Sequence, residues 1–318
     1  MTESAAPWLA SNAAYLAELR KCLKGQPAAL IQDALADASE FLRDAAAENP
    51  GASESDTLAR VVESYGSPQE VAQEYVKMEQ TVQSPFPNVR DDGDREAGGG
   101  FFGVLIDPRA YGAYIYMLLS LGTGIFYFTW GVTGLSLTLA FAILIIGIPF
   151  ALLFLGSIRV IGWIEGRLVE ALLGVRMPRR LDVEPGDGGT VWQRIKAMVV
   201  DGRTWSSLIY MLLMLPLGVV YFVIAVVGGT ISLACLTAPI GRQMMNRDFV
   251  NIDIRGLGDE LNLNWDVNTE QLNQFLNSDA GLALLVVVGF FLTIVMLHVA
   301  RAIGYLHGKL AEAFLVRF

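Results

Sequence analysis

One apolar pattern occurs twice in this chain. Residues 107–128 and 201–222 are identical at 11 of 22 positions when the first stretch is shifted by 94 (201 − 107). A second match, between residues 159–171 and 301–313, requires a shift of 142 (301 − 159). The second copy therefore carries 48 extra residues (142 − 94) in its middle. Such a repeat predicts two related structural units within one chain.

Each copy consists mainly of long apolar stretches. Residues 111–157 run for 47 positions without a charge, whereas one membrane-spanning helix needs about 20 residues. The first copy is therefore predicted to form two spans, with a tight turn near Val132–Ser136. The second copy supplies a third span from about Trp205 to Gly228 and a fourth from Ala280 to Val299. The apolar run Thr230–Gly241 is expected to lengthen the third helix.

The predicted fold class is all-α. With 53% hydrophobic residues, arranged in uninterrupted blocks, the chain is expected to be a polytopic membrane protein with four transmembrane helices, preceded by a cytoplasmic helical bundle. A stretch rich in proline, glycine and charge separates the two parts and is expected to be a flexible tether. The predicted domains are a bundle at 1–83, a linker at 84–100 and a membrane domain at 101–318, with repeats at 107–176 and 201–317 and an extracytoplasmic insertion at about 242–279.

The N-terminal part is predicted to contain four short amphipathic helices. Its clearest local signal is Ser67-Pro68-Gln69-Glu70, which has the spacing of a capping box at the start of the last helix. The residues Tyr15–Leu19 and Tyr65–Ala72 resemble the HAAS-type helical domain, which is found ahead of membrane segments in bacterial sensor-like proteins. The usual HAAS pattern has leucine where Tyr65 stands.

The membrane part also resembles a known family. The motifs are Asp107–Tyr111, Gly147–Pro149 and Arg159–Gly174, with Asp201–Trp205 repeating the first of them. These resemble the Putative sensor family, whose hairpins precede signalling domains in bacterial membrane histidine kinases. Kinase members continue into dimerisation and ATP-binding domains, whereas this sequence ends at Phe318. The resemblance therefore implies that any output passes through another protein.

The distribution of charge predicts an orientation. Residues 158–206 hold eight Lys and Arg, whereas the insertion holds three Arg against seven Asp and Glu. The positive-inside rule places the basic stretch in the cytoplasm and the acidic insertion outside. The N-terminus shows no basic region followed by an apolar run, so no cleavable signal peptide is expected. The prediction is a multi-pass protein of the bacterial inner (plasma) membrane with both termini in the cytoplasm.

Small residues and interfacial residues recur at matching places in the two copies. Two pairs of glycines four positions apart are the packing candidates: Gly162, Gly166, Gly304 and Gly308. Because small residues at this spacing let helix backbones approach closely, the glycines are predicted to form a contact between the copies, a dimer seam, or ordinary small-residue packing. Residues suited to the membrane–water interface are predicted to anchor the helix ends. These anchors are Asp107, Arg109, Trp163, Asp201, Arg203, Trp205 and Tyr305.

Several function classes are excluded by what the sequence lacks. It carries no nucleotide-binding, nucleophile or zinc-protease motif, so an enzyme is not expected and no catalytic residue is assigned. Cys22 and Cys235 form no metal-binding spacing, and no metal or cofactor is predicted. Residues 1–98 carry a net charge of −9 (8 basic minus 17 acidic), which argues against nucleic acid as a partner. His298 and His307 are interpreted as structural residues without a carboxylate neighbour, with a metal or proton-relay role as the less favoured alternative. No buried acid is expected in mid-span.

The favoured interpretation is a non-enzymatic sensor or adaptor that relays an envelope or ligand state to a cytoplasmic regulatory partner through residues 1–83. An alternative is a structural or accessory subunit of a membrane complex such as a transporter, and a weaker one is a lipid or small-molecule transporter. The expected partners are the lipid bilayer and one of these proteins, and a homo-oligomer is possible. The insertion is expected to fold into a small cap with a short helix at Asn268–Leu276, as either a receptor for an external ligand or a lid.

Overall fold

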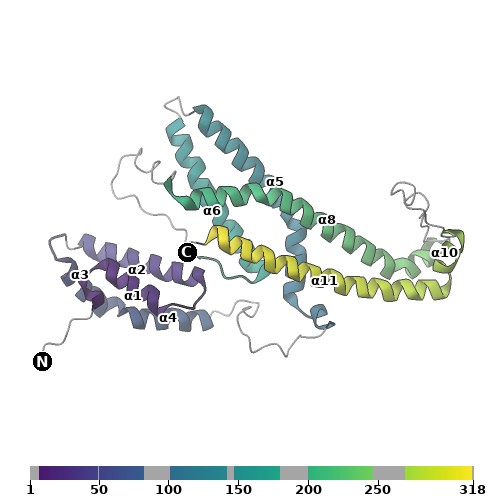
Figure 1. The fold of residues 1–318 in the computed structure, drawn as a ribbon, viewed down its shortest axis with the longest axis horizontal. Helices are drawn as coiled ribbons and strands as arrows, with labels where there is room; N and C mark the ends of the chain where they lie inside the picture. Colours follow the sequence, from purple (N-terminus) through teal and green to yellow (C-terminus); the bar gives the residue numbers. More distant parts are fainter. Residues whose placement is uncertain are drawn as a thin grey trace. The chain divides into compact units, whose positions relative to one another are not determined.

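The computed structural model describes residues 7–48, 50–81, 101–141, 147–179, 200–245 and 269–316. All regular elements in these ranges are helices, so the predicted all-α class is confirmed for them (Figure 1). The linker predicted at 84–100 and most of the predicted insertion lie outside the described residues. From the insertion, the short helix α10 is observed at Thr269–Leu276, as predicted.

The N-terminal part is a bundle of four helices. A 3-10 turn, η1, precedes them at Pro7–Ala10. The helices are α1 (Asn12–Cys22), α2 (Ala28–Glu48), α3 (Glu54–Tyr65) and α4 (Pro68–Thr81). A serine or proline lies at the start of each helix, because Ser11 caps α1, Pro27 precedes α2, Ser53 caps α3 and Pro68 is the first residue of α4.

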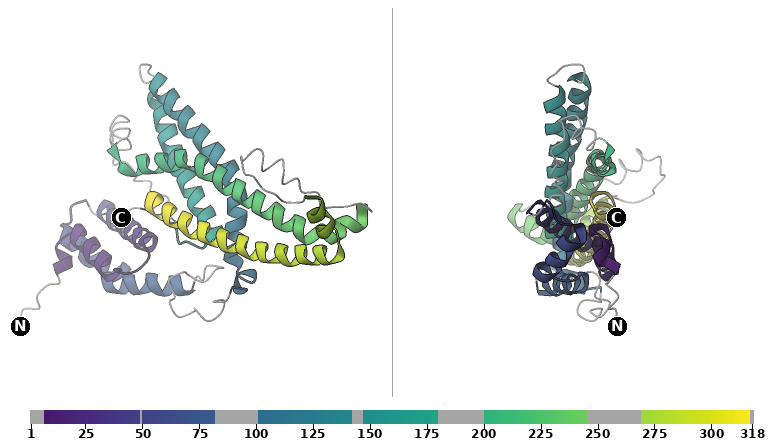
Figure 2. Two further views of the ribbon diagram at one scale, coloured as in Figure 1. Left: turned by 45° about the vertical axis from the view of Figure 1, so that its right-hand side comes forward. Right: turned by 90° about the vertical axis from the view of Figure 1, so that its left-hand side faces the viewer.

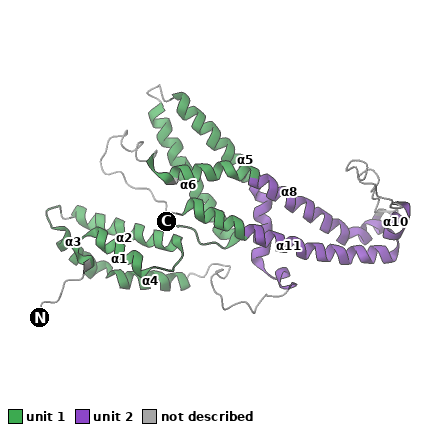
Figure 3. Ribbon diagram, viewed as in Figure 1, with its two compact units in different colours: residues 1–93, 122–216, 305–318 green, residues 94–121, 217–304 purple. Residues whose placement is uncertain are grey.

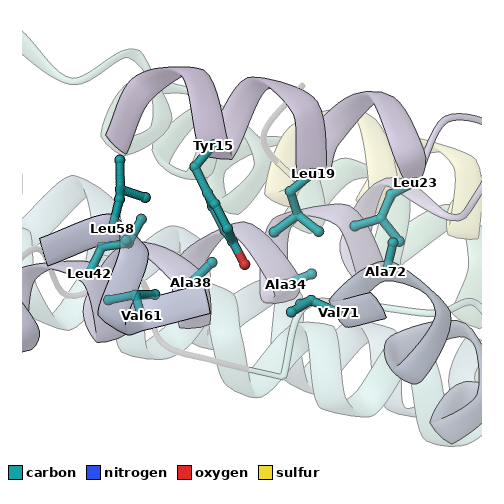
Figure 4. Packing of buried hydrophobic residues seen from close by; sticks show 10 residues of the cluster. All are labelled: Tyr15, Leu19, Leu23, Ala34, Ala38, Leu42, Leu58, Val61, Val71 and Ala72. Carbon is teal, nitrogen blue, oxygen red and sulfur yellow. The ribbon is translucent and has the colours of Figure 1, made fainter. Parts of the chain in front are cut away.

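Tyr15 lies at the centre of the bundle core (Figure 4). Its ring is fully buried, and its hydroxyl donates a hydrogen bond of 2.8 Å to the carbonyl oxygen of Gly66. Burial raises the pKa of Tyr15 well above its usual value, so the hydroxyl remains a donor. Tyr65, which departs from the usual HAAS pattern, stacks on Phe41 with ring centroids 4.6 Å apart. The surrounding core residues are Leu19, Leu23, Ala34, Ala38, Leu42, Leu58, Val61, Val71 and Ala72.

The predicted capping box is present at the start of α4. The backbone N–H of Ser67 donates to Glu70 Oε2 at 2.8 Å, and the backbone N–H of Glu70 donates to Ser67 Oγ at 3.4 Å. The hydrogen bonds from Ser67 lower the pKa of Glu70. The carboxylate form is therefore the form that the cap stabilises.

Acid is expected to loosen the first turn of α4. A depressed pKa contributes stability above the unfolded value of 4.5, and this contribution is lost as the pH falls through the lower folded value. Hydrogen exchange of the α4 amides, measured from about pH 5 down to about pH 3 and corrected for intrinsic rates, should rise in the wild type. Glu70→Gln should remove the dependence, and Glu74→Gln, exposed on the same helix, should keep it. An unchanged profile in Glu70→Gln would contradict the assignment.

Four helices of the second part are long and apolar enough to cross a membrane, as predicted. They are α5 (Pro108–Phe141), α6 (Gly147–Leu173), α8 (Gly202–Met245) and α11 (Asp279–Leu315), and a 3-10 turn, η2 (Gly103–Leu105), precedes α5. The 44 residues of α8 extend for about 66 Å, about twice the hydrocarbon core of a bilayer. The third span therefore continues well beyond Gly228, as the apolar run after it predicts. The chain is a multi-pass membrane protein.

The turn predicted near Val132–Ser136 is wrong, because these residues lie inside α5. The helix continues to Phe141, and α6 begins at Gly147. Gly134 serves close packing instead of a turn: a Cβ at this position would overlap the ring of Phe154 in α6. The two helices lie side by side here (Figures 1 and 2).

The described helices are distributed over two compact units (Figure 3). Unit 1 comprises residues 1–93, 122–216 and 305–318, and unit 2 comprises residues 94–121 and 217–304. Helices α5, α8 and α11 each contribute residues to both units, whereas the N-terminal bundle and α6 belong to unit 1.

Candidate functional site

The two copies of the repeat contact each other through a matched pair of glycines. Gly124 in α5 and Gly218 in α8 are equivalent under the shift of 94 (218 − 124). In unit 1, a Cβ on Gly124 would lie 2.5 Å from the carbonyl oxygen of Met214. In unit 2, a Cβ on Gly218 would overlap the carbonyl oxygen of Ser120, which is the repeat equivalent of Met214 (214 − 120 = 94). Each copy thus presses a glycine against the backbone of the other.

Ion pairs also join the end of each copy to the start of the other. In unit 1, Arg159 from copy one binds Asp201 at the start of copy two, with Nη2 and Oδ2 2.8 Å apart. In unit 2, Arg301 from copy two lies 3.4 Å from Oδ2 of Asp107 at the start of copy one. These are equivalent pairs under the two repeat shifts. Asp107 also accepts the backbone N–H of Arg109, and so caps α5.

Two of the four glycines predicted to pack helices, Gly162 and Gly308, lie near residues of the other copy. The nearest atoms to a Cβ on Gly162 belong to Leu315 and Ser207 of copy two, at 3.5 and 3.7 Å. A Cβ on Gly308 would lie 2.5 Å from Val175, just after α6. Gly166 packs against Met177, and Gly304 is buried. Their role in oligomerisation stays a prediction.

The remaining predicted anchors differ in position, since Arg109, Arg203 and Trp205 lie in the first turns of α5 and α8, whereas Trp163 and Tyr305 lie inside α6 and α11. Trp205 and Tyr305 are exposed, and Arg109 is half-buried. Arg203 lies in the first turn of α8, with a side chain outside the described part. Trp163 has a more specific contact, because its indole N–H donates to the carbonyl oxygen of Arg179 at 3.1 Å. That contact belongs to a larger ionic site.

This site joins the N-terminal bundle to the segment that follows α6. Arg176 is almost fully buried, with 8% of its side chain exposed. Its Nη2 lies 3.0 Å from Asp33 Oδ2 in α2, and its Nε lies 2.8 Å from Glu79 Oε1 in α4. We call the junction cluster the six residues Asp33, Glu79, Arg167, Glu170, Arg176 and Arg179.

The rest of the junction cluster fixes the segment 174–179 to α6. The backbone N–H of Arg179 donates to both carboxylate oxygens of Asp33, at 3.0 and 3.1 Å. Its guanidinium lies 3.4 Å from Glu170 of α6. Arg167 of α6 lies 2.6 Å from Glu170 and donates to the carbonyl oxygens of Met177 and Pro178 at 3.0 Å each. One segment is thus bound on one side by the bundle and on the other by a membrane helix.

The junction cluster is electrically balanced, with three arginines against three carboxylates. Buried ion pairs are stable only when their hydrogen bonds are satisfied, and removing one partner costs about 3–5 kcal/mol. Arg176 faces carboxylates from α2, α4 and α6. The geometry therefore favours a defined seat for the bundle, and a change at the end of α6 has a direct path to α2.

A second polar site lies inside the membrane helices of unit 1. Glu165 of α6 is buried, and both of its carboxylate oxygens accept hydrogen bonds, from Tyr127 of α5 at 2.8 Å and Tyr210 of α8 at 2.9 Å. The hydroxyl of Tyr210 also lies 2.9 Å from His307 Nε2 of α11. His307 is fully buried, and its Nε2 is 4.0 Å from Glu165. Four helices thus converge on one carboxylate.

This arrangement corrects two sequence-based expectations. No buried acid was expected within a span, yet Glu165 of α6 is buried, whereas Ile164 beside it is exposed. His307 was expected to lack a carboxylate neighbour and has one in Glu165. Hydrophobic periodicity failed here because a lipid-facing helix turns its apolar side outward and its polar residues inward. His298 meets the expectation of a structural residue better, since its Nε2 lies 3.1 Å from the carbonyl oxygen of Phe101.

An apolar groove reaches this buried site from the side. It lies between α5 and α6 and has a volume of about 290 Å³. Its lining residues are Gly122, Thr123, Phe126, Tyr127, Ile161 and Ile164. The phenol of Tyr127 thus borders the groove and also donates to Glu165. Among the described residues, no group of three or more His, Cys, Asp or Glu side chains is arranged to hold a metal ion.

Comparison with known proteins identifies both parts. The family model described as HAAS matches residues 14–74, which form the N-terminal bundle. The family model described as Putative sensor matches residues 116–315, which is 200 of the 318 residues. No curated protein and no solved structure matches the chain. The chain belongs to the Putative sensor family and carries a HAAS domain ahead of its membrane helices.

Proposed function

We propose that this protein is a non-enzymatic sensor or adaptor of the bacterial inner membrane. In this proposal the membrane helices register an envelope or ligand state, and the HAAS bundle at residues 1–83 transmits it to a cytoplasmic regulatory protein. Membership of a sensor family supports a signalling role for the membrane part. The charge bias of the loops supports cytoplasmic termini.

The observation that carries the proposal is the junction cluster. A bundle that only anchored or solubilised the chain would need no buried ion pair with the membrane part. Here Asp33 of the bundle holds both a guanidinium and a backbone N–H of the segment after α6. Because Glu170 binds the same segment from α6, a movement of α6 alters the seat of the bundle. Ion pairs and packed side chains of this kind are among the structures that carry coupling between distant sites.

The test is the identity and the junction dependence of the bound proteins. The full-length protein is extracted in mild detergent, and the co-purifying proteins are identified by mass spectrometry beside Arg176→Gln. We expect a soluble regulatory protein whose recovery changes at least threefold in Arg176→Gln, since the bundle has lost its seat. Lys77→Gln, which removes a cation from α4 of the bundle and not from the junction cluster, should leave recovery unchanged. Recovery of transporter subunits in equal amount from all three proteins would overturn the relay and favour an accessory subunit.

A further inference from the structure

The buried polar site of the membrane helices is built from equivalent positions of the repeat. Glu165 and His307 are related by the shift of 142 (307 − 165). Their neighbours are matched in kind, since Gly166 corresponds to Gly308 and Arg167 to Lys309. At this repeat position, which is buried in both copies, copy one carries an acid and copy two a base. The phenol of Tyr210 lies between them, 2.9 Å from each.

The same heavy-atom positions accommodate two arrangements of protons. In the first, Glu165 is a carboxylate, Tyr210 donates to it, and His307 donates its Nε2–H to the oxygen of Tyr210. In the second, Glu165 carries a proton and donates to Tyr210, which donates to an unprotonated Nε2. Each phenol has one proton to give, so the two arrangements exclude each other. Tyr127 donates to the other oxygen of Glu165 in both.

One proton converts the first arrangement into the second. It binds His307 at Nδ1, and the Nε2–H proton passes to the Tyr210 oxygen as the Tyr210 proton passes to Glu165 Oε1. One N–H bond forms and one breaks on the imidazole, one O–H bond forms and one breaks on the phenol, and one O–H bond forms on the carboxyl group. The site changes from a net charge of −1 to neutral, and it gains one proton.

We propose that the Glu165–Tyr210–His307 chain is a proton-binding site, and that the proton is the ligand that this membrane domain reads. The claim that the proton is the ligand being read rests on the proposed sensor function. The claim that the site binds a proton rests on the geometry alone. A buried carboxylate in a low-dielectric setting changes its surroundings strongly when it is neutralised. Protonation of Glu165 can therefore shift the balance between two positions of α6.

The site is directly connected to the junction cluster. Gly166, the next residue after Glu165, packs against Met177, and Arg167 binds the carbonyl oxygens of Met177 and Pro178. The residues on either side of this pair, Arg176 and Arg179, bind Asp33 of the bundle. A small rotation or shift of α6 on protonation therefore acts on the segment that seats the bundle.

The groups around Glu165 are consistent with a local proton equilibrium. The titratable groups that face its carboxylate are Tyr127 from α5, Tyr210 from α8 and His307 from α11. Between residues 122 and 141 α5 carries no charge, and the unit 1 part of α8 carries only Arg203, about two turns before Tyr210. Lys309 of α11 lies over the ring of Tyr305. The other charged residues of α6 and of the segment after it bind partners away from Glu165, and they are Arg159, Arg167, Glu170, Arg176 and Arg179.

The test follows protonation and the seat of the bundle in the same protein. Full-length protein in lipid nanodiscs is titrated from about pH 4 to about pH 9, across the range where carboxyl and imidazole groups exchange protons. Infrared difference spectra report the carboxylic C=O band, and spin labels at Ala46→Cys and Ala171→Cys, with Cys22 and Cys235 replaced by serine, report the distance from α2 to α6. We expect a C=O band that appears on acidification, is absent in Glu165→Gln, and shares its midpoint with a change in the label distance.

Two further variants keep the result decisive. Tyr210→Phe removes the linking hydroxyl with little change in volume and is expected to move the midpoint by about one pH unit, the size of one hydrogen bond. Should Glu165→Gln fail to fold, His307→Gln tests the chain from its other end, because removing the imidazole is also expected to move the midpoint of the C=O band. A C=O band that does not change with pH in the wild type overturns the proton site and leaves the co-purification result untouched. A titrating band with a constant label distance overturns the proton as the ligand that is read.

Discussion

Replacing Gly124 by alanine is expected to destabilise the membrane domain by about 1–3 kcal/mol, the usual cost of overpacking a close contact. The sign is informative, because alanine is a better helix former than glycine by about 1 kcal/mol and would stabilise α5 in the absence of a neighbour. At Gly124 the added methyl group meets the backbone carbonyl of Met214. A backbone carbonyl cannot rotate away as a side chain does, so the helices must separate and lose contacts on both sides.

Gly122 provides the matched control two residues earlier on the same helix. It is exposed, and a Cβ there meets nothing within 4 Å. Gly122→Ala is therefore expected to be neutral or stabilising, and Gly218→Ala should repeat the loss seen at Gly124. Unfolding in mixed micelles of increasing denaturing-detergent content gives all three free energies of unfolding on one scale. Equal values for Gly122→Ala and Gly124→Ala would show that the copies do not cross at these glycines.

The repeat shift relates residues through which the two copies contact each other in the structure. Asp107 and Asp201 were recognised as equivalent, and so were Arg159 and Arg301, yet the sequence does not show that each aspartate binds the arginine of the other copy. Gly124 and Gly218 were visible as a match inside the spans. Repeat arithmetic defines equivalence, whereas contact between the copies depends on how they pack, which no local pattern encodes.

Helix boundaries were predictable where the signals are local. The capping box at Ser67–Glu70 and the Asp-Pro pair at the start of α5 each mark a helix start through contacts within a few residues. The turn at Val132–Ser136 was wrong for the opposite reason. Glycine is common in turns, but Gly134 instead allows close packing of the Phe154 ring, which lies 20 residues away in α6. Sequence alone does not separate these two uses of glycine.

The buried polar site left a signal that could have been found. Glu165 and His307 fall at the same place in two otherwise similar segments, between matched glycines and matched bases. An acid and a base at one repeat position of a membrane helix are costly in lipid unless they face inward. The expectation that no buried acid lies within a span hid this. For a membrane helix the same pattern predicts charges inside.

No comparable signal in the sequence marks the junction cluster. Asp33 lies 143 residues from Arg176 in the sequence, and nothing local distinguishes it from the other acids of the bundle.

The junction cluster provides the second large prediction. Asp33→Ala is expected to release the bundle from its seat at a cost of about 3–5 kcal/mol, because the guanidinium of Arg176 and the N–H of Arg179 lose a shared buried acceptor. The bundle itself should remain folded, since Asp33 faces outward from its core.

Asp44→Ala is the control on the same helix. Its carboxylate is exposed and 3.6 Å from Arg43, and an exposed pair of this kind contributes about 0–1 kcal/mol. The spin-label distance between positions 46 and 171 in detergent should broaden in Asp33→Ala and stay narrow in Asp44→Ala. Asp33→Asn should fall between them, because an amide oxygen still accepts hydrogen bonds but carries no charge to balance Arg176. If Asp33→Ala kept the narrow distance, the bundle would be held by contacts other than the junction cluster, and α6 would have no route to it through residues 174–179.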